Sequence, residues 1–551
     1  MSDRIDCLVI GYNDLDFSEH EGRVMPRSPR FPDRRIFMRD HLLVGDRRLP
    51  YMDVFNTFAN RVRAGDTDEN YYHVGEVPNL AAVYLTSFLI RHGFSAEFVS
   101  LFSPERDRVA RLLDERDPRA VAITTTFYIT PAPVIEIVRF IRARNPETTI
   151  IVGGPLVDNL TTEVDRETLT DLFDLMDADV YVRESQGEAT LARVVEALRD
   201  GRSLENTPNL YLRQGDGLTF TGVQRENNSL DDSAVDWTLF SDQELGATVQ
   251  LRTARSCAFN CSFCDFPARA GALTLADIST VEQELHVLAK RGVRNLVFID
   301  DTFNVPPKRF TELLRMMDRN DFDFNWYSFF RCSSTRDDET FDLMQRTGCR
   351  AVFLGIESAS DTVLKQMNKS ASAARYRHGI EQLKARGITT FASFVVGFPG
   401  ENDETVQETI DFLNSTAPTF FRAEPWWYNH RSPIHRRAEE LEITGQGYDW
   451  RHRTMDVHGA CDARDAIFDG VTTSKWIPSY NFDFWALPYL EGKGFSLEDH
   501  AVTFHTLAAQ AMRWNDQPGH PESAAAIDGL AHLFEQIDLA PAKYLASTSQ
   551  R

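Results

Sequence analysis

The sequence predicts an α/β protein that begins with a doubly wound parallel sheet, continues with a six-unit series of strands and helices, and ends in a mostly helical region. Three observations support this prediction. Strand patterns alternate with helix patterns over residues 6–199 and again over residues 247–425. The tail at 497–545 is alanine-rich and has a helical pattern. At 551 residues, the chain is also too long for a single hydrophobic core.

The first domain is expected over residues 1–205, and 206–246 as a linker. A buried strand at 6–12 precedes a polar, Arg- and Pro-rich insertion at 15–75, which is long for a connection within a compact domain. Strands and helices then alternate, with strands at 96–101, 120–126, 149–155 and 180–183 and helices at 79–92, 108–115, 133–144 and 188–199. Such alternation implies a parallel sheet that binds ligands beyond the carboxyl ends of its strands. Periodicity alone fits any flavodoxin-like domain.

Three cysteines follow the first strand of the central series, at the spacing C-x3-C-x2-C: Cys257, Cys261 and Cys264. Three thiolates cannot complete a four-cysteine iron–sulfur site or a structural zinc site. An iron–sulfur cubane that they hold keeps one iron open for a substrate. The alternatives are a zinc knuckle or a redox pair at Cys261 and Cys264, and neither explains the region that follows.

The central series is predicted over residues 247–425. Its strands are expected at 248–252, 295–299, 325–330, 351–355, 389–396 and 420–422, and its helices near 279–291, 307–318, 337–347, 372–386 and 403–414. Active residues of such parallel series lie at the carboxyl ends of the strands.

Distinctive sequences stand at these strand ends. Asp300-Asp301 ends the second strand, Arg331 follows the third, Gly-Ile-Glu357 ends the fourth, and Val396-Gly397 ends the fifth. Taken singly, Asp301 and Glu357 also fit ordinary acids at helix N-termini, and Arg331 fits a strand cap.

The cysteine motif, these strand-end motifs in this order, and an N-terminal domain with a Thr-rich strand end and a Gly-Gly-Pro turn resemble the cobalamin-binding (class B) radical S-adenosylmethionine (SAM) enzymes. The resemblance covers residues 1–425. It implies a partial (β/α)6 barrel at 247–425 behind a cobalamin-binding domain, with a C-terminal substrate or cover domain at 426–551. The implied cofactors are a [4Fe-4S] cluster on Cys257, Cys261 and Cys264, SAM, and cobalamin.

The resemblance also assigns cofactor contacts. Asp301 is expected near the SAM ammonium, Arg331 near its carboxylate, Glu357 at a ribose hydroxyl, and Val396 and Gly397 along the adenine. The expected cobalamin contacts are Thr124, Thr125, Thr126, Gly153, Gly154 and Glu188. The Asp-x-His-x-x-Gly motif of other cobalamin enzymes is absent, and His20 has the wrong spacing for it, so no histidine is expected on the lower face of cobalt.

Most members of this family are methyltransferases that use two SAM molecules. One methylates cobalamin; the other is cleaved to a radical that abstracts a substrate hydrogen, and the substrate radical then takes the methyl group. An external electron donor of the flavodoxin or ferredoxin type is implied. The cofactors carry this chemistry, while the protein positions them and excludes water.

The segments 423–430 and 447–455 place Trp, Tyr and His side chains after the barrel, where they line a pocket or form the core of a small domain. Tyr428, His430 and His452 are candidates for positioning the substrate or moving a proton. Both segments look similar to an antibiotic-pathway subgroup with phosphinate P-methyltransferases and aminocoumarin pyrrole C-methyltransferases.

The aromatic segments favour an unactivated carbon acceptor, such as a carbon of a pyrrole ring in a natural-product intermediate. P-methylation of a phosphinate remains open, because Arg422, Arg431 and His435 supply cations. A non-methylating cobalamin radical SAM cyclase or rearrangement enzyme shares every motif. A methylthiotransferase needs a second cysteine set, which Cys7 alone cannot provide, and an iron–sulfur electron carrier has no need of Glu357.

The bulk composition limits the partners and the compartment. The formal charge of 59 − 82 = −23 argues against a surface for nucleic acid. Apolar runs are too short for a bilayer span, and the N-terminus lacks a basic-then-apolar signal. We therefore expect a cytoplasmic enzyme with a small-molecule acceptor, in a reducing compartment that fits its scattered remaining cysteines, Cys7, Cys332, Cys349 and Cys461.

Overall fold

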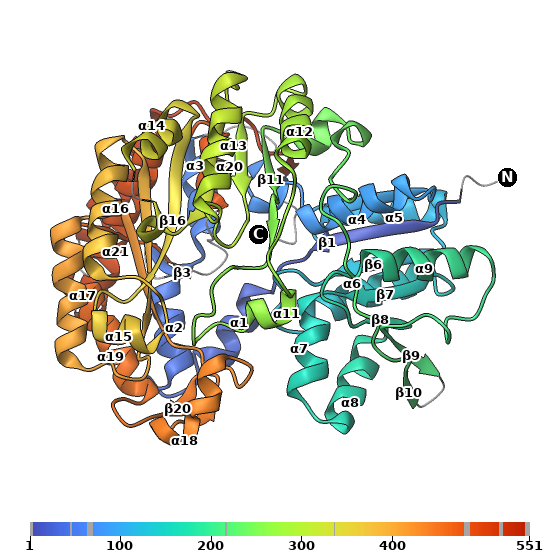
Figure 1. The fold of residues 1–551 in the computed structure, drawn as a ribbon, viewed down its shortest axis with the longest axis horizontal. Coiled ribbons are helices and arrows are strands. Elements are labelled where there is room, and N and C mark those ends of the chain that lie inside the picture. Colours follow the sequence, from blue (N-terminus) through green and yellow to red (C-terminus); the bar gives the residue numbers. More distant parts are fainter. Residues whose placement is uncertain are drawn as a thin grey trace. The chain divides into compact units, whose positions relative to one another are not determined.

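The structure, a computed structural model, describes residues 4–44, 47–62, 70–214, 217–335, 337–478, 485–516 and 522–545. It divides into two compact units (Figure 1). Unit 1 comprises residues 1–17, 75–250 and 279–291, and unit 2 comprises residues 18–74, 251–278 and 292–551. Among the described residues, no helix is long and apolar enough to span a membrane.

Unit 1 is built on a seven-stranded sheet in the order β10-β9-β8-β7-β6-β1-β5. Its strands are β1 (Cys7–Tyr12), β5 (Ala96–Leu101), β6 (Ala120–Thr124), β7 (Thr149–Gly153), β8 (Val180–Val182), β9 (Leu210–Gln214) and β10 (Gly217–Phe220). The first five strands pair in parallel, and β9 and β10 extend the sheet in antiparallel fashion. Taken alone, the parallel strands have the order 2-1-3-4-5 of flavodoxin-like folds, with the switch point between β1 and β6.

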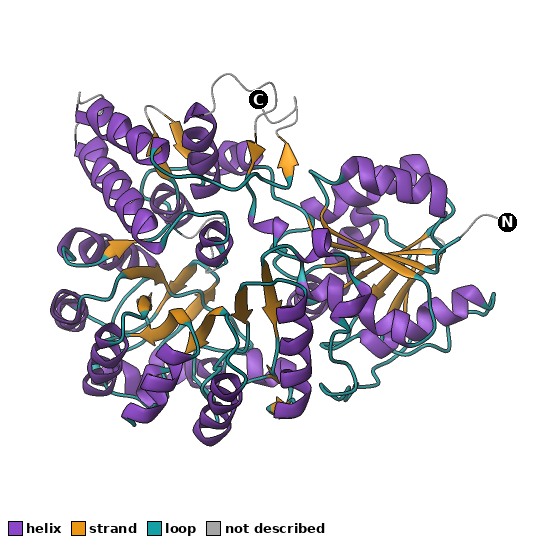
Figure 2. Cartoon of the chain, turned by 90° about the horizontal axis from the view of Figure 1, so that it is seen from above, coloured by secondary structure: helices purple, strands orange, loops and turns teal. Residues whose placement is uncertain are grey.

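Helices cover both faces of this sheet (Figure 2). They include α4 (Leu80–Arg91), α5 (Arg106–Arg116), α6 (Ala132–Arg144), α7 (Pro155–Glu163), α8 (Arg166–Met176) and α9 (Glu188–Arg199), with α10 (Asp242–Leu245) and α12 (Ile278–Lys290) in later segments. The predicted linker at 206–246 contains β9, β10 and α10, so part of it continues the first sheet.

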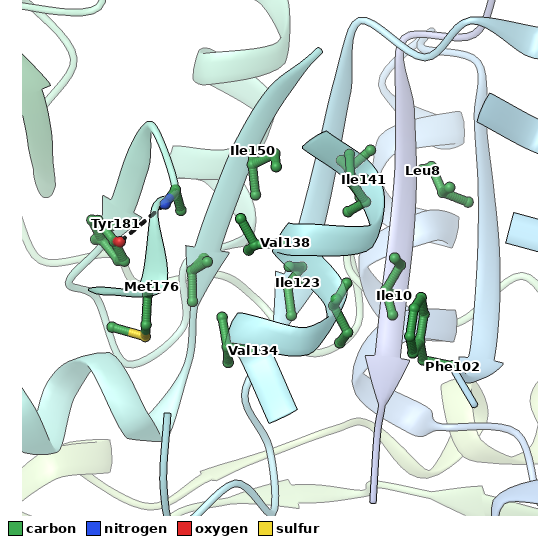
Figure 3. Close-up of a cluster of buried hydrophobic side chains, with 14 of the residues drawn as sticks. Leu8, Ile10, Phe102, Ile123, Val134, Val138, Ile141, Ile150, Met176 and Tyr181 are labelled. Carbon is green, nitrogen blue, oxygen red and sulfur yellow. Dashed lines mark hydrogen bonds between the residues drawn. The ribbon is translucent and has the colours of Figure 1, made fainter. Parts of the chain in front are cut away.

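The core of unit 1 lies between the sheet and its helices (Figure 3). Ile10 and Ile123 on neighbouring strands are almost fully buried beside Val134 and Val138 of α6. At the edge of this cluster, Tyr181 donates its hydroxyl to the Phe173 carbonyl at 2.6 Å. Because its polar atom is satisfied, the tyrosine is buried without an unpaired hydroxyl.

Unit 2 contains a second seven-stranded sheet in the order β11-β14-β15-β16-β17-β18-β21. Its strands are β11 (Thr248–Leu251), β14 (Asn295–Phe298), β15 (Asn325–Phe330), β16 (Cys349–Glu357), β17 (Thr389–Val396), β18 (Phe420–Pro425) and β21 (Lys475–Trp476). The helices between them are α13 (Pro307–Arg319), α14 (Asp338–Arg346), α15 (Asp361–Gln366), α16 (Ala373–Ala385) and α17 (Asp403–Thr416). The pairs from β14 to β21 are parallel, so the predicted series is confirmed, and β21 adds a seventh strand.

One face of this sheet is turned away from the helices. Phe330 of β15 packs edge-to-face against Phe310 of α13, at 5.9 Å between ring centroids, so Phe330 faces outward. Its neighbour Phe329 therefore faces the inside, because successive side chains of a strand alternate. Strand register carries this inner face across to Phe353 and then to Phe391.

The inner face continues upward in rows, as in a barrel core. Gly355, Ser393 and Arg422 are register partners in the next row. Val395 and Glu424 follow in the row nearest the carboxyl ends. The inner face thus changes from phenylalanine at its floor to polar side chains at its top.

Residues 18–74 cluster with unit 2, whereas the sequence analysis placed the insertion at 15–75 within the first domain. Arg35 forms an ion pair with Asp465 at 2.6 Å, and the hydroxyl of Tyr51 hydrogen-bonds with His500 at 2.8 Å. The elements are α1 (Phe17–Val24), α2 (Pro32–Asp40), β2 (Leu42–Val44), β3 (Arg47–Leu49), α3 (Tyr51–Val62) and β4 (Asn70–Tyr71). This stretch is therefore more regular than its sequence pattern indicated.

The C-terminal region is mostly helical, as predicted. It comprises α18 (Ala438–Leu441), β19 (Thr444–Gln446), β20 (Asp449–Arg451), α19 (Val457–Gly470), α20 (Ala486–Glu491), α21 (Leu497–Asp516), α22 (Glu522–Glu535) and β22 (Tyr544–Leu545). The short strand β22 pairs with β4 in antiparallel fashion, which ties the end of the described chain to the N-terminal insertion.

Candidate functional site

The three cysteines lie in a loop of unit 2 that follows β12 (Ala254–Arg255). Cys261 is buried, Cys257 and Cys264 are half-buried, and all three are free thiols. Burial raises the pKa of Cys264 to about 11, and the charges of Cys261 and Cys257 add to this rise. The three thiols are thus close enough to influence one another.

Within the described residues, no three His, Cys, Asp or Glu side chains converge as they would on one metal ion. A zinc ion takes all its ligands around a single centre, whereas a cubane takes each cysteine on a different iron.

The cysteine loop is held by main-chain hydrogen bonds from distant segments. Ser262 donates its amide to the Met367 carbonyl at 2.8 Å, and its own carbonyl accepts from the amide of Ile434 at 2.9 Å. The side chain of Asn368 donates to the carbonyl of Asn260 at 2.8 Å. The loop backbone is thus fixed without use of the thiols.

The two aspartates after β14 have different roles. Asp300 is buried and accepts hydrogen bonds from the amides of Thr253 and Ala254, at 2.7 and 2.9 Å. It therefore fixes the strand that leads into the cysteine loop. Asp301 remains solvent-accessible. Desolvation and the neighbouring charge of Asp300 raise the pKa of Asp301 to about 7. Asp301 is the one that keeps its carboxyl group accessible for a ligand.

Arg331 lies over the cysteine loop. Its guanidinium carbon is 3.8 Å from the ring centroid of Phe259, between the first two cysteines. The side chain is 4% exposed, and its Nε and Nη2 have no hydrogen-bond partner among the described residues. A buried cation with unpaired donors is costly, so this site requires an anionic partner. The SAM carboxylate expected near Arg331 would carry such a charge.

Glu357, at the end of β16, is held by Lys369. The Lys369 Nζ donates to Glu357 Oε1 at 2.8 Å. Glu357 has a φ of +67°, and the strand register shifts between Gly355 and Glu357. Such an irregularity re-aims a side chain. A Cβ at Gly355 would lie 2.6 Å from Glu357 Oε1, so a larger residue there would force the carboxylate away from its present position.

The turn after β17 contains Val396 and Gly397. Gly397 has a φ of +86°, and a Cβ there would lie 2.5 Å from Cβ of Ala460. Its amide donates to the buried carboxyl group of Glu401, and desolvation raises the pKa of Glu401 to about 7. The Val396 carbonyl accepts from the amide of Trp426 at 2.7 Å. The turn is therefore rigid and backbone-rich.

His452 also supports this turn. Its Nε2 donates to the Gly397 carbonyl at 2.9 Å, and its Nδ1 accepts from the amide of Thr454 at 3.3 Å. Burial lowers the pKa of His452, which favours this neutral tautomer. Its ring stacks on Trp450, with 5.1 Å between centroids and 3° between planes. Since both ring nitrogens are engaged, His452 acts here as a positioning residue.

Tyr428 and His430 lie on the segment after β18. Tyr428 is 2% exposed, and its hydroxyl shares a 2.7 Å hydrogen bond with Nδ1 of His435. His430 donates through Nε2 to the Gly445 carbonyl at 2.9 Å, and its ring stacks on His435 at 4.5 Å between centroids. The structure thus gathers Tyr428, His430 and His435 into one cluster and places His452 at a separate turn.

The predicted cobalamin contacts lie at the carboxyl ends of β6 and β7 in unit 1. The Thr125 hydroxyl donates to the Gly153 carbonyl at 2.9 Å and accepts from the Leu156 amide at 3.1 Å. A Cβ at Gly154 would lie 2.9 Å from Thr125 Oγ1, so the two strand ends pack closely. Thr125 therefore shapes this edge of the sheet.

Thr124, Thr126 and Glu188 complete this predicted set. The hydroxyls of Thr124 and Thr126 lie 3.2 Å apart. Glu188 is buried at the start of α9, and its Oε2 accepts from Nδ2 of Asn228 at 2.8 Å. Glu188 thus hydrogen-bonds with Asn228, and the threonines and glycines lie at the carboxyl ends of β6 and β7.

Two residues of the site were not singled out from the sequence. Lys369 is twelve positions from Glu357 and belongs to no strand end. Glu401 lies in the fifth strand-end motif, where its buried carboxyl group fastens the Gly397 amide. The only sequence signal for Glu401 is an acid directly after a Gly-x-Pro-Gly turn. Nothing in the sequence pattern pointed to Lys369.

Two family models match the chain. The radical SAM superfamily matches residues 251–413, and the B12 binding domain matches residues 73–183. The first match contains the cysteine loop and the strand ends with Asp301, Arg331 and Glu357. The second begins beyond most of the insertion that clusters with unit 2. The expected pairing of a cobalamin-binding domain with a radical SAM domain is confirmed.

Curated relatives match at low identity. An uncharacterized methyltransferase of Pyrococcus horikoshii is 25% identical over 346 residues, which is 61% of this chain and 72% of that protein. An anaerobic magnesium-protoporphyrin IX monomethyl ester cyclase of Rubrivivax gelatinosus is 26% identical over 361 residues, which is 62% of this chain and 63% of that protein.

Solved structures share the fold. The radical SAM methyltransferase TsrM from Kitasatospora setae, with cobalamin and a [4Fe-4S] cluster bound, aligns with a TM-score of 0.60 and 17% identity over 80% of this chain and 97% of that chain. The cobalamin-dependent SAM radical enzyme OxsB, with aqua-cobalamin and SAM bound, aligns with a TM-score of 0.53 and 14% identity over 84% and 69% of the two chains. At these identities the likeness establishes the fold.

Proposed function

We propose that this chain, a radical SAM enzyme with a B12-binding domain, is a methyltransferase. Its proposed acceptor is an unactivated carbon of a natural-product intermediate, such as a heteroaromatic ring carbon. The observation that carries the proposal is the buried guanidinium of Arg331 over the cysteine loop, with two nitrogens that need an anionic partner. A methyltransferase among the relatives, and another among the solved structures, supports the reaction type.

Each cofactor has residues that fit it. Cys257, Cys261 and Cys264 would hold the [4Fe-4S] cluster. Asp301, Arg331, Glu357 and the backbone at Val396 and Gly397 would hold SAM, and the threonine and glycine strand ends of unit 1 would hold cobalamin. When bound, these groups supply a carbon-centred radical and a transferable methyl group.

The chain's own residues position and shield this chemistry. Lys369 orients the Glu357 carboxylate, since the two side chains form a buried ion pair. His452 and Glu401 hold the carbonyl and the amide of Gly397. The phenylalanine floor of the inner face, Phe329, Phe353 and Phe391, is apolar and would exclude water from this chemistry.

Tyr428 and His435 are proposed to position the acceptor. Their hydrogen bond at 2.7 Å joins two polar side chains on the segment that follows β18. The acceptor hydrogen would leave as an atom to the radical, so the methylated carbon has no proton to lose. His430 supports His435 through ring stacking.

A second candidate function is a cobalamin-dependent radical cyclisation without methyl transfer. The magnesium-protoporphyrin ester cyclase relative, at 26% identity, favours it.

P-methylation of a phosphinate is a variant of the first proposal. Three side chains, Arg422, Arg431 and His435, are the candidate cations for a phosphinate. Arg431 lies 3.6 Å from Asp265, and His435 hydrogen-bonds with Tyr428, which leaves Arg422 for an anionic acceptor.

The test is anaerobic reconstitution with iron, sulfide and hydroxocobalamin, followed by SAM and a reductant of the flavodoxin or ferredoxin type. Bound cobalamin, 5′-deoxyadenosine and S-adenosylhomocysteine are then quantified by mass spectrometry. The methyltransferase proposal expects stoichiometric cobalamin and both SAM products. Deoxyadenosine without S-adenosylhomocysteine would favour the cyclase, and neither product would contradict both.

A further inference from the structure

The inner face of the unit 2 sheet carries a cation that the cofactor contacts leave unused. Arg422 projects from β18 in the same row as Ser393 of β17 and Gly355 of β16. It is half-buried, and its Nε is buried without a hydrogen-bond partner among the described residues. An acceptor for this Nε would come best from an anion, because Nε is cut off from water and the group carries a positive charge.

The nearest acid on the same strand is paired elsewhere. Glu424 lies one row above Arg422 on the inner face. Its Oε2 is 3.9 Å from Nη1 of Arg464, which is fully buried on α19. Arg464 in turn donates to the carbonyl of Arg35 at 2.7 Å, so its position is fixed from the other side. Glu424 is therefore balanced by Arg464 rather than by Arg422.

The surroundings of Arg422 combine this charge with an apolar floor. Phe329 and Phe353 meet at 5.1 Å between centroids, and Phe353 and Phe391 at 4.7 Å, both edge-to-face. Phe391 lies two residues before Ser393, so the floor is one row below Arg422, or about 7 Å along the strand. The site thus has an apolar floor of phenylalanine side chains below the Arg422 guanidinium.

Tyr448 marks the outer limit of this site. Burial and the charges of Glu424 and Asp40 raise its pKa, while Arg422 and Arg464 oppose the rise. The ring of Trp427 meets Tyr448 edge-on at 4.8 Å, and Trp427 is 58% exposed. Aromatic side chains therefore stand beside the charged residues as well as below them.

We infer that the acceptor carries an oxyanion, a carboxylate or a phosphinate, which Arg422 binds while the apolar body of the acceptor packs on Phe329 and Phe353. This inference rests on the proposed methyl transfer and names the acceptor class for the same site. An arginine presents a planar pair of donors that matches either oxyanion.

Binding of paired probes tests the inference. Titration calorimetry on the full-length, reconstituted chain with SAM compares pyrrole-2-carboxylate with pyrrole-2-carboxamide, and phenylphosphinate with its methyl ester. We expect at least one anion to bind about tenfold or more tightly than its neutral counterpart, since hydrogen bonds to charged groups contribute that much. The preferred pair distinguishes a carboxylate acceptor from a phosphinate acceptor.

Variants of Arg422 test whether this residue causes the preference for the anionic probe. Arg422→Gln should abolish the preference for the anion and leave the affinity for the neutral probe and for SAM unchanged. Arg422→Lys should retain part of it. Arg436→Gln, an exposed arginine of the same unit, is the control that should change nothing. Unchanged SAM affinity shows that the variants fold.

Equal binding of anions and neutral probes, or a preference that survives Arg422→Gln, would overturn the inference. Its failure is distinct from failure of the proposed function. If a neutral acceptor is methylated while neither anion is preferred, the methyltransferase stands and the oxyanion site falls. If the Arg422-dependent preference is found but no S-adenosylhomocysteine forms, the binding site stands and the methyl transfer falls.

Discussion

The Nζ of Lys369 lies 2.8 Å from Oε1 of Glu357, in an ion pair of which only 7% and 13% of the two side chains are exposed. Glu357 stands at a strand end with a left-handed φ of +67°, so its carboxylate depends on a partner from outside the strand. Through this ion pair, Lys369, which lies outside the strand ends, orients the Glu357 carboxylate that is proposed to contact the SAM ribose.

Lys369→Met should weaken SAM binding about tenfold and lower the melting temperature, because it leaves the Glu357 carboxylate buried and uncompensated. Equilibrium dialysis with labelled SAM and thermal denaturation measure the two effects. Lys365→Met, at an exposed position four residues earlier, is the matched control and should change neither. Unaltered SAM affinity in Lys369→Met would show that the pair has a structural role alone.

Arg331→Gln should raise the KM for SAM tenfold to about a hundredfold, since it removes the charge expected to meet the SAM carboxylate. Formation of 5′-deoxyadenosine at varied SAM concentrations measures KM and kcat separately. Iron content should remain that of the parent protein, because the contact of Arg331 with the cysteine loop is to the ring of Phe259. A loss of iron with unchanged KM would assign Arg331 to the cysteine loop instead.

Gly397→Ala should destabilise the protein and impair SAM binding, because a Cβ there would lie 2.5 Å from Ala460 and 2.6 Å from the Trp450 ring. Gly387 has a comparable φ of +70° with nothing within 4 Å of its Cβ position. Gly387→Ala therefore has similar backbone strain, about 1–2 kcal/mol, without the clash. Denaturant unfolding of both variants separates the two causes, and equal losses would argue against steric exclusion.

Glu401→Gln should flatten the dependence of stability on pH. Burial raises the pKa of Glu401 in the folded protein to about 7, above the value near 4.5 of the free side chain. The folded state therefore holds a proton that the unfolded state has released, and stability falls as pH rises from about 4.5 through 7. The difference in free energy of unfolding between parent and variant should change by roughly 3 kcal/mol between pH 4.5 and pH 7.

Thermal or urea denaturation at pH 5 and pH 7.5 measures this difference. Removing the ionisable group also removes its desolvation cost at neutral pH, so Glu401→Gln should be relatively more stable at pH 7.5 than at pH 5. A difference that does not change between the two pH values would mean that Glu401 is ionised in the folded protein at both.

The sequence predicted the regular elements closely where local pattern determines structure. The strands Asn325–Phe330 and Thr389–Val396 and the helix Glu188–Arg199 were expected with these same bounds. Their alternating or helical burial follows directly from residue order. The two family models confirm the resemblance to cobalamin-binding radical SAM enzymes. The sequence could reveal it since the cysteine spacing and the strand-end motifs are local patterns.

Long-range pairing was not accessible in the same way. The insertion at 15–75 lacks a clear period, and its partners Asp465 and His500 lie more than four hundred residues away. Lys369 carries no motif, and the role of Glu401 depends on a hydrogen bond across a turn. His452 fits a catalytic histidine by residue type, but its two nitrogens are engaged by Gly397 and Thr454.

The placement of residues 18–74 with unit 2 has a consequence for synthesis of the chain. Strand β4 at Asn70–Tyr71 pairs with β22 at Tyr544–Leu545, and Phe55 packs on Phe534 at 5.2 Å. At typical translation rates of about 5–20 residues per second, the early segment waits roughly half a minute or more for these partners. The apolar side of α3 is therefore exposed to the ribosome surface and to chaperones for that time, and C-terminal truncations of the gene should yield aggregated rather than merely inactive protein.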